Sequence, residues 1–120
     1  MSGNINFNGW LNDDGSENYK CRAWVNFNGT GTVAIRASGN VTSITDNGTG
    51  DYTVNFTTAM VDADYSVQVI AARSDASPNI IGGIYSTGTP YNTSSIRVTA
   101  VRPTVADLFD APYLNVAVFR

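Results

Sequence analysis

Short runs of alternating apolar and polar residues, separated by turn-forming residues, constrain the fold of this chain most strongly. Such a period of two places apolar side chains on one face of a β-strand. Glycine, asparagine and aspartate cluster between the runs, where turns are expected. The runs cover residues 21–27, 33–37, 41–45, 52–57, 65–71, 80–85, 96–101 and 113–119. The pattern predicts about eight strands from residue 20 onward.

The clearest turn signal lies in residues 46–51, whose sequence is DNGTGD. Asn-Gly pairs favour tight hairpin turns, because these turns need positive φ angles. We therefore expect the runs on either side, residues 41–45 and 52–57, to pair as an antiparallel hairpin.

The composition also favours sheet over helix. Valine and isoleucine together number 20 against three leucines, and only 14% of the residues are charged. β-Branched residues suit strands, and no amphipathic helical stretch separates the runs. The predicted fold class is all-β, an antiparallel β-sandwich or jelly-roll-like domain. Residues 104–110 have the composition of a single helical turn.

Several function classes are disfavoured by what the sequence lacks. There is no histidine, which removes the usual general base and metal ligand. The single cysteine, Cys21, permits neither an internal disulfide nor a cysteine zinc site. A net charge of −3 argues against a nucleic-acid partner. We predict that the protein is not an enzyme and has no membrane-spanning segment or signal peptide.

The chain divides into an arm (residues 1–19) and a sandwich domain (residues 20–120). The arm is rich in asparagine, aspartate and glycine, with a few isolated apolar residues. Ile5, Phe7 and Trp10 are its candidate anchors for attachment or inter-subunit contact. Ile5 and Phe7 alternate with asparagines, as in a strand that could pair with another subunit's sheet edge. A frayed terminus is the equally weighted alternative.

Aromatic residues are the main candidates for a binding surface, because sugar rings stack on them. Trp24, Tyr52, Tyr65 and Tyr113 occupy strand positions, where burial is the default expectation. Tyr85 and Tyr91 instead border a predicted loop, residues 86–95, that also contains Asn92. Tyr85, Tyr91 and Asn92 are therefore the candidate residues for binding a host-surface glycan.

Paired carboxylates give no clear catalytic or metal signal. Asp62 and Asp64 lie one residue apart in a predicted loop, but a calcium site needs more oxygen ligands. Loop solvation accounts for such pairs, since aspartate hydrogen-bonds its own backbone in turns. Glycosidase chemistry would also need a defined carboxylate pair, which nothing marks out here. We predict no catalytic residues, no metal site and no cofactor.

The first half of the domain carries a family resemblance. The run WVNFNGTGTVAIR at residues 24–36, then VTSITDNGTGDYTVNF at 41–56 and TTAM at 57–60, resembles a module of bacteriophage and prophage virion proteins. The similarity covers about residues 20–120. Such modules often end tail fibre or tail-associated proteins. The resemblance implies a non-enzymatic, virion-exposed protein, commonly homotrimeric, and brings no functional residue set.

These observations lead to one expected function and two alternatives. The first is a tail fibre or tail-tip component of the virion, assembled in the host cytoplasm, with the arm contacting other virion proteins. Because only 19 residues precede the domain, a trimeric capsid decoration protein on the phage head is the first alternative. A free carbohydrate-binding module is the second.

Overall fold

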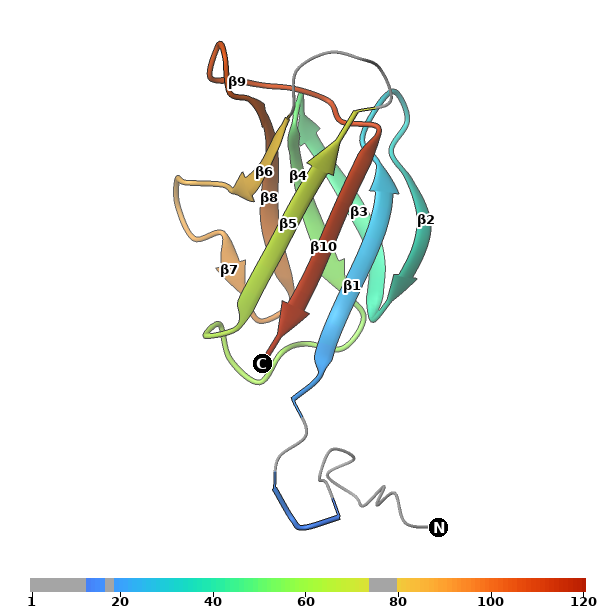
Figure 1. Ribbon diagram of the computed structural model, residues 1–120, viewed down its shortest axis with the longest axis vertical. Coiled ribbons are helices and arrows are strands. Elements are labelled where there is room, and N and C mark those ends of the chain that lie inside the picture. The colour runs from blue at the N-terminus through green and yellow to red at the C-terminus, as the bar shows by residue number, and fades with distance from the viewer. Residues whose placement is uncertain (1–12, 17–18, 74–79) are drawn as a thin grey trace.

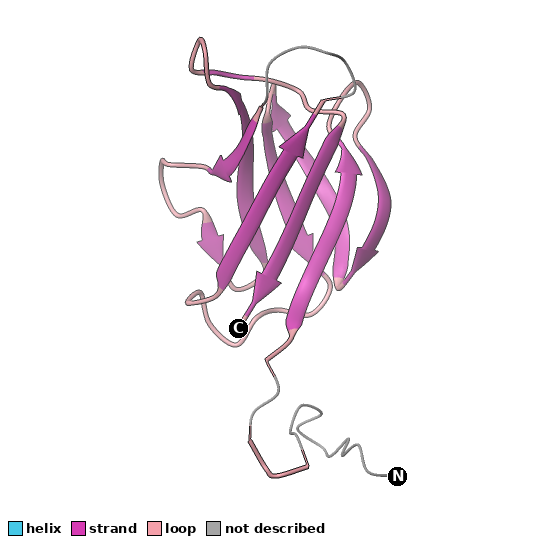
Figure 2. Cartoon of the chain, in the orientation of Figure 1, coloured by secondary structure: helices cyan, strands magenta, loops and turns pink. Residues whose placement is uncertain are grey.

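The computed structural model describes residues 13–16, 19–73 and 80–120, which form strands, turns and loops without a helix. Ten strands are present (Figures 1 and 2). They are β1 (Cys21–Asn28), β2 (Ala34–Gly39), β3 (Val41–Gly48), β4 (Asp51–Phe56), β5 (Ser66–Ala72), β6 (Ile81–Ile84), β7 (Tyr91–Asn92), β8 (Ser95–Arg102), β9 (Asp107–Leu108) and β10 (Tyr113–Phe119). The predicted all-β class is confirmed.

The strands form two antiparallel sheets packed face to face as a sandwich (Figure 1). One sheet has four strands in the order β2-β1-β10-β5. The other has the order β3-β4-β8-β6, and the short strands β7 and β9 also pair with β8. Strand β8 is thus the centre of its sheet, with β4 along one side and β6 along the other.

All eight expected strands are present, and the two additional ones are only two residues long. One of them, β9, replaces the helical turn expected over residues 104–110. The Ala106 N–H does donate to the Arg102 carbonyl at 2.8 Å, but the chain then folds back to pair with β8. A bidentate ion pair between Arg102 and Asp107 closes this hairpin, which a continued helix would prevent.

The predicted hairpin at residues 46–51 joins β3 to β4. Its positive φ angles fall on Gly48 (137°) and Gly50 (63°), whereas Asn47 keeps a negative φ. A Cβ added at Gly50 would lie 2.6 Å from the Ala100 carbonyl oxygen. Glycine is therefore required there both by the backbone angle and by the close approach of the neighbouring chain.

The core lies between the sheets and consists of the inward-facing residues of the alternating runs. Its largest fully buried side chains are Tyr52, Phe27, Ile96, Leu114, Val25, Val54, Val98 and Val118. The rings of Phe27 and Tyr52 meet edge to face with centroids 5.3 Å apart. Each sheet therefore contributes one partner to this aromatic contact, which ties the two layers together.

Two of the four aromatic residues expected in the core are not buried. Tyr52 and Tyr65 are buried, as expected. Trp24 is 44% exposed and Tyr113 is 39% exposed, so the expectation was wrong for these two. The reason is the strand period: Trp24 lies between the buried Ala23 and Val25, so its side chain points to the opposite face.

Candidate functional site

The ring of Tyr85, one of the predicted binding residues, is partly covered by Arg97. The guanidinium carbon of Arg97 lies 3.7 Å from the centre of the Tyr85 ring. Arg97 also binds Asp51 through two hydrogen bonds, at 2.8 and 2.7 Å. The Asp51 hydrogen bond raises the pKa of Arg97. Tyr85 therefore packs in a Tyr85–Arg97–Asp51 stack on β6, β8 and β4.

Tyr91 and Asn92, the other predicted binding residues, form β7 and pair with the start of β8. The Tyr91 ring packs on Tyr65 with centroids 5.3 Å apart. The Asn92 carbonyl accepts from the Tyr65 hydroxyl at 2.8 Å, and its side-chain amide donates to the Thr89 carbonyl. Burial raises the pKa of Tyr65 to about 12. These contacts hold the loop against the sandwich, and glycan binding by it stays a prediction.

The predicted arm anchors Ile5, Phe7 and Trp10 lie outside the described residues. Of the arm, the structure describes residues 13–16 and Tyr19, all exposed. The Asp14 carboxylate accepts from the backbone N–H and the hydroxyl of Ser16. The Ser16 hydrogen bonds lower the pKa of Asp14. This short turn is exposed, and it places the side chains of Asp13 and Asp14 in water.

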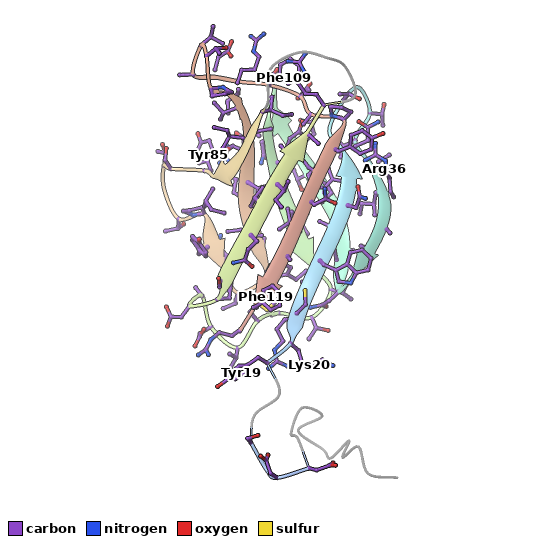
Figure 3. The ribbon with its side chains drawn as sticks, viewed as in Figure 1. Tyr19, Lys20, Arg36, Tyr85, Phe109 and Phe119 are labelled. Carbon is purple, nitrogen blue, oxygen red and sulfur yellow. The ribbon has the colours of Figure 1, made fainter. Side chains whose placement is uncertain are left out.

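Four large apolar side chains are exposed on the outer face of the four-stranded sheet. We call it the aromatic face and define it by Trp24, Ile70, Tyr113 and Phe119. These side chains are 44%, 64%, 39% and 41% exposed. Trp24 faces Ala117 across the β1–β10 pair, and Ile70 faces Asn115 across β10–β5, so the surface crosses three strands. Figure 3 shows Phe119 near the end of β10.

Two of the three rings of the aromatic face, those of Trp24 and Tyr113, are held in place by their neighbours. A Cβ added at Gly39 would lie only 2.4 Å from the Trp24 indole nitrogen, so the indole lies directly on the β2 backbone. The Arg36 guanidinium carbon lies 4.3 Å from the centre of the Tyr113 ring. Arg36 also donates to the Pro112 carbonyl at 2.6 Å. The face is therefore preorganised, which lowers the entropy cost of binding a partner.

Charge and polarity distinguish this surface from the other outer face of the sandwich. The four strands of the aromatic sheet contain two arginines, Arg22 and Arg36, and no aspartate or glutamate. Across the molecule, β3 and β4 carry neutral side chains that bond one another. Asn55 donates to Ser43 and Thr45. The polar side chains of the β3–β4 face thus bond one another, whereas the aromatic face exposes rings to solvent.

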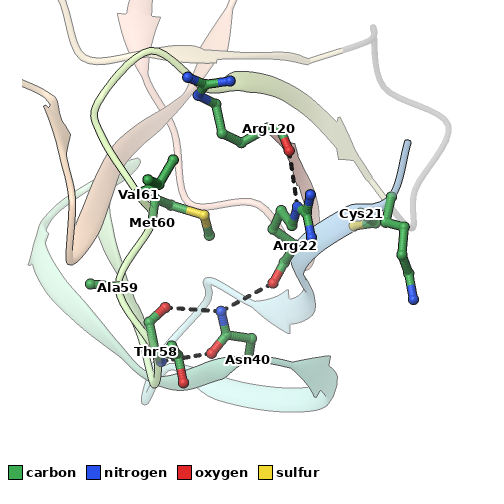
Figure 4. A pocket seen from close by; sticks show the side chains of 9 residues that line it. Cys21, Arg22, Asn40, Thr58, Ala59, Met60, Val61 and Arg120 are labelled. Carbon is green, nitrogen blue, oxygen red and sulfur yellow. Dashed lines mark hydrogen bonds between the residues drawn. The ribbon is translucent and has the colours of Figure 1, made fainter. Parts of the chain in front are cut away.

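A cavity of about 540 Å³ opens at the end of the sandwich where β1 begins (Figure 4). We call it the basal cavity. Its lining residues are Lys20, Cys21, Arg22, Asn40, Thr58, Ala59, Met60, Val61 and Arg120. Of its three cationic side chains, Arg120 pairs with Asp62 at 2.8 Å and Arg22 donates to the Arg120 main-chain oxygen at 2.9 Å. Its volume lies within the range of about 300–1,000 Å³ typical of ligand pockets.

Asp62 and Asp64, the pair weighed as a metal motif, serve other roles. Asp62 forms a bidentate ion pair with Arg120, with both distances 2.8 Å. The Asp64 N–H donates to the Asp62 carboxylate at 2.9 Å. These bonds lower the pKa of Asp62 to about 2, with the Arg120 hydrogen bond as the main cause. Among the described residues, no three His, Cys, Asp or Glu side chains gather as a metal site would require.

Comparison with known proteins returned no match to a protein family, to a curated protein or to a solved structure. Within the described part of the chain, no helix has the length and apolar character needed to cross a membrane.

Proposed function

We propose that this chain is a non-enzymatic structural protein of a bacteriophage virion, a tail fibre or tail-tip component that associates as a homotrimer. The observation that carries the proposal is the aromatic face. Exposed rings that are held in place, on a sheet whose strands carry no carboxylate side chain, favour burial against another protein. The resemblance of residues 24–60 to phage virion modules supports the virion assignment.

Self-association through the aromatic face is tested by light scattering of the full chain over a range of concentrations. We expect a mass near three times the 12.8 kDa of one chain. Trp24→Ser removes the central ring and shifts the equilibrium toward monomer by at least tenfold in concentration. The matched control is Val105→Ser, which removes a more exposed apolar residue (60%, against 44% for Trp24) from the β8–β9 turn. A wild-type chain that stays monomeric overturns this part of the proposal.

The location in the virion is tested by immunogold electron microscopy with an antibody against residues 20–120. Label confined to the tail supports a fibre or tip component. Label spread over the head identifies the capsid decoration alternative instead. Virions that carry the gene but bind no antibody exclude both assignments.

Glycan binding is the second candidate function, and the exposed indole of Trp24 favours it. Because the ring lies on the Gly39 backbone, its outer side is a flat apolar surface on which a sugar ring can stack. We expect saturable binding by the full chain on a glycan array to be lost in Trp24→Ser. Loss in Tyr85→Ala or Tyr91→Ala, with Trp24→Ser unaffected, would instead place the binding site in the β6–β8 loop.

A further inference from the structure

Arg36 is an exposed cation beside the aromatic face, on the β2 side of the sheet (Figure 3). Its guanidinium donates to the Asn26 side-chain oxygen at 3.2 Å and to the Pro112 carbonyl at 2.6 Å, and it lies over the Tyr113 ring. Among the described residues, the ion pairs with carboxylates involve other arginines. A guanidinium has five N–H donors, so Arg36 can still bind an anion from outside the chain.

The surroundings of Arg36 favour an anionic ligand. The four strands of this sheet carry no carboxylate side chain that would repel one. The two hydrogen bonds and the ring contact also hold the guanidinium in place. A guanidinium that is already fixed loses little conformational entropy when it binds a carboxylate, and its planar fork matches the two carboxylate oxygens.

Trp24 provides a flat apolar surface next to this cation. Its indole lies on the Gly39 backbone and is 44% exposed. Trp24 pairs with Gly39 on one side and with Ala117 on the other, so neither neighbouring strand places a large side chain opposite it. Asn26 follows on the same face of β1, about 7 Å further along the strand. Its side-chain oxygen accepts from Arg36, which leaves its N–H groups to donate to a ligand oxygen.

The indole, the amide and the guanidinium together match an acidic oligosaccharide. The C–H face of a sugar ring stacks on an indole, its hydroxyls accept from an amide, and its carboxylate pairs with a guanidinium. Tyr113 lies four positions along β10 from Ala117, the partner of Trp24. Because the guanidinium contacts both Asn26 and Tyr113, it lies about 7–13 Å along the strands from Trp24. This span is longer than one sugar ring, so the ligand contains several units.

We infer that the aromatic face, together with Arg36, binds an acidic oligosaccharide. One sugar ring stacks on Trp24, and the carboxylate of a neighbouring unit pairs with Arg36. Trp24 supplies affinity for sugar rings in general, whereas Arg36 supplies the preference for acidic over neutral glycans. An acidic peptide is disfavoured, because peptides are usually bound in grooves or along an unpaired strand edge, and β1 is paired on both sides. The inference rests on the glycan-binding candidate in the proposed function and adds the chemical class of the glycan.

Isothermal titration calorimetry of the full chain tests the preference for acidic glycans. The probes are oligomers of galacturonate, alginate and hyaluronan, each compared with its own methyl ester, which keeps the sugar rings and removes the charge. The protein is used at a concentration at which light scattering shows monomer, so that self-association does not compete. We expect wild type to bind at least one of these acids about fivefold more tightly than its ester, a factor typical of an exposed ion pair.

Two positions separate the contributions of charge and stacking. Arg36→Gln should reduce the difference between acid and ester to about twofold or less, whereas Arg36→Lys should retain part of it, because lysine keeps the charge but lacks the planar fork. The matched control is Arg102→Gln, which removes a guanidinium that also lies over a ring, that of Phe109 at 5.1 Å, and should leave the difference unchanged. Trp24→Ser should abolish the binding of acid and ester alike.

The salt dependence of wild type tests the same point without a substitution. Raising the NaCl concentration to about 0.5 M should remove most of the preference, because salt screens exposed charges. A preference that does not change with salt overturns the inference. So does an oligoglutamate peptide that binds as tightly as the acidic glycans, since charge alone would then be recognised.

The remaining outcomes distinguish this inference from the proposed function. Equal binding of acids and esters, or a full preference in Arg36→Gln, overturns the inference but leaves glycan binding through Trp24 standing. If none of these glycans binds, the inference and the glycan-binding candidate both fail. Trimer formation and the location in the virion are decided by their own experiments in either case.

Discussion

Replacing Tyr52 with phenylalanine should destabilise the domain by about 2 kcal/mol at neutral pH. The Tyr52 side chain is fully buried, and its hydroxyl lies 2.8 Å from both the Gly29 carbonyl and an Asp110 carboxylate oxygen. Phenylalanine keeps the ring contact with Phe27 but leaves both acceptors without this donor. A buried acceptor that loses its donor costs roughly 1–3 kcal/mol. Asp110 retains the Gly50 N–H at 2.8 Å, which limits the loss.

Thermal unfolding followed by circular dichroism measures this cost. For a chain of this length, about 2 kcal/mol corresponds to a melting temperature lower by roughly 8 °C. Tyr52→Leu serves as the comparison and should cost more, because it also removes the edge-to-face contact. A melting temperature of Tyr52→Phe within 2 °C of wild type would refute the reasoning, since the hydroxyl would then contribute no net stability.

The difference in stability between wild type and Tyr52→Phe should become smaller at high pH. Burial, followed by the nearby Asp110, raises the pKa of Tyr52 well above its ordinary value of about 10. Above pH 10 the unfolded chain releases this proton while the folded chain retains it. The wild-type stability should therefore fall by about 1.4 kcal/mol per pH unit from this group, whereas Tyr52→Phe lacks this loss. A gap between the two proteins that does not narrow between pH 9 and pH 11 would contradict the assignment.

Three further substitutions test the surfaces described above. Gly39→Val should displace the Trp24 indole and shift its N–H resonance in NMR spectra, whereas Gly83→Ala should leave that resonance in place. Asp51→Ala should lower the free energy of unfolding in urea by about 1–2 kcal/mol, because the nearly buried Asp51 carboxylate loses its two hydrogen bonds with the partly exposed Arg97. Asp62→Asn should lower the melting temperature at pH 6. The difference from wild type should disappear as the pH falls toward and below 2, because a carboxyl with a lowered pKa stabilises the fold only while it is ionised.

The strand pattern was readable from the sequence because alternation is a local signal. The pattern also predicts that Trp24 is exposed, because this residue alternates in phase with Arg22 and Asn26 rather than with Val25. The general tendency of aromatic residues to be buried led to the wrong expectation. Tyr113 follows the same rule, because it is out of phase with the buried Leu114. The strand phase was thus the better guide to which aromatic side chains are exposed.

Contacts between distant parts of the chain could not be read in this way. Arg97 meets Asp51 from 46 positions away, and this pairing determines which ring face of Tyr85 is covered. Likewise, β7 and β9 are too short to show a period. They pair with the parts of β8 that extend beyond the ends of β6 and β4. The basal cavity depends on Asn40 linking two segments, which no local pattern indicates.

The distribution of polar and apolar side chains indicates that one outer face of the sandwich favours water and the other favours burial against a partner. With only 14% charged residues, the chain relies on neutral Asn, Thr and Ser side chains, and on β3 and β4 these bond one another. Groups already paired gain little by binding a partner, so that face favours solvent. The aromatic face gains most from burial but, lacking carboxylates, carries little electrostatic information about orientation. Burial of the aromatic face would then supply the affinity for a partner, whereas the β3–β4 face would stay in water.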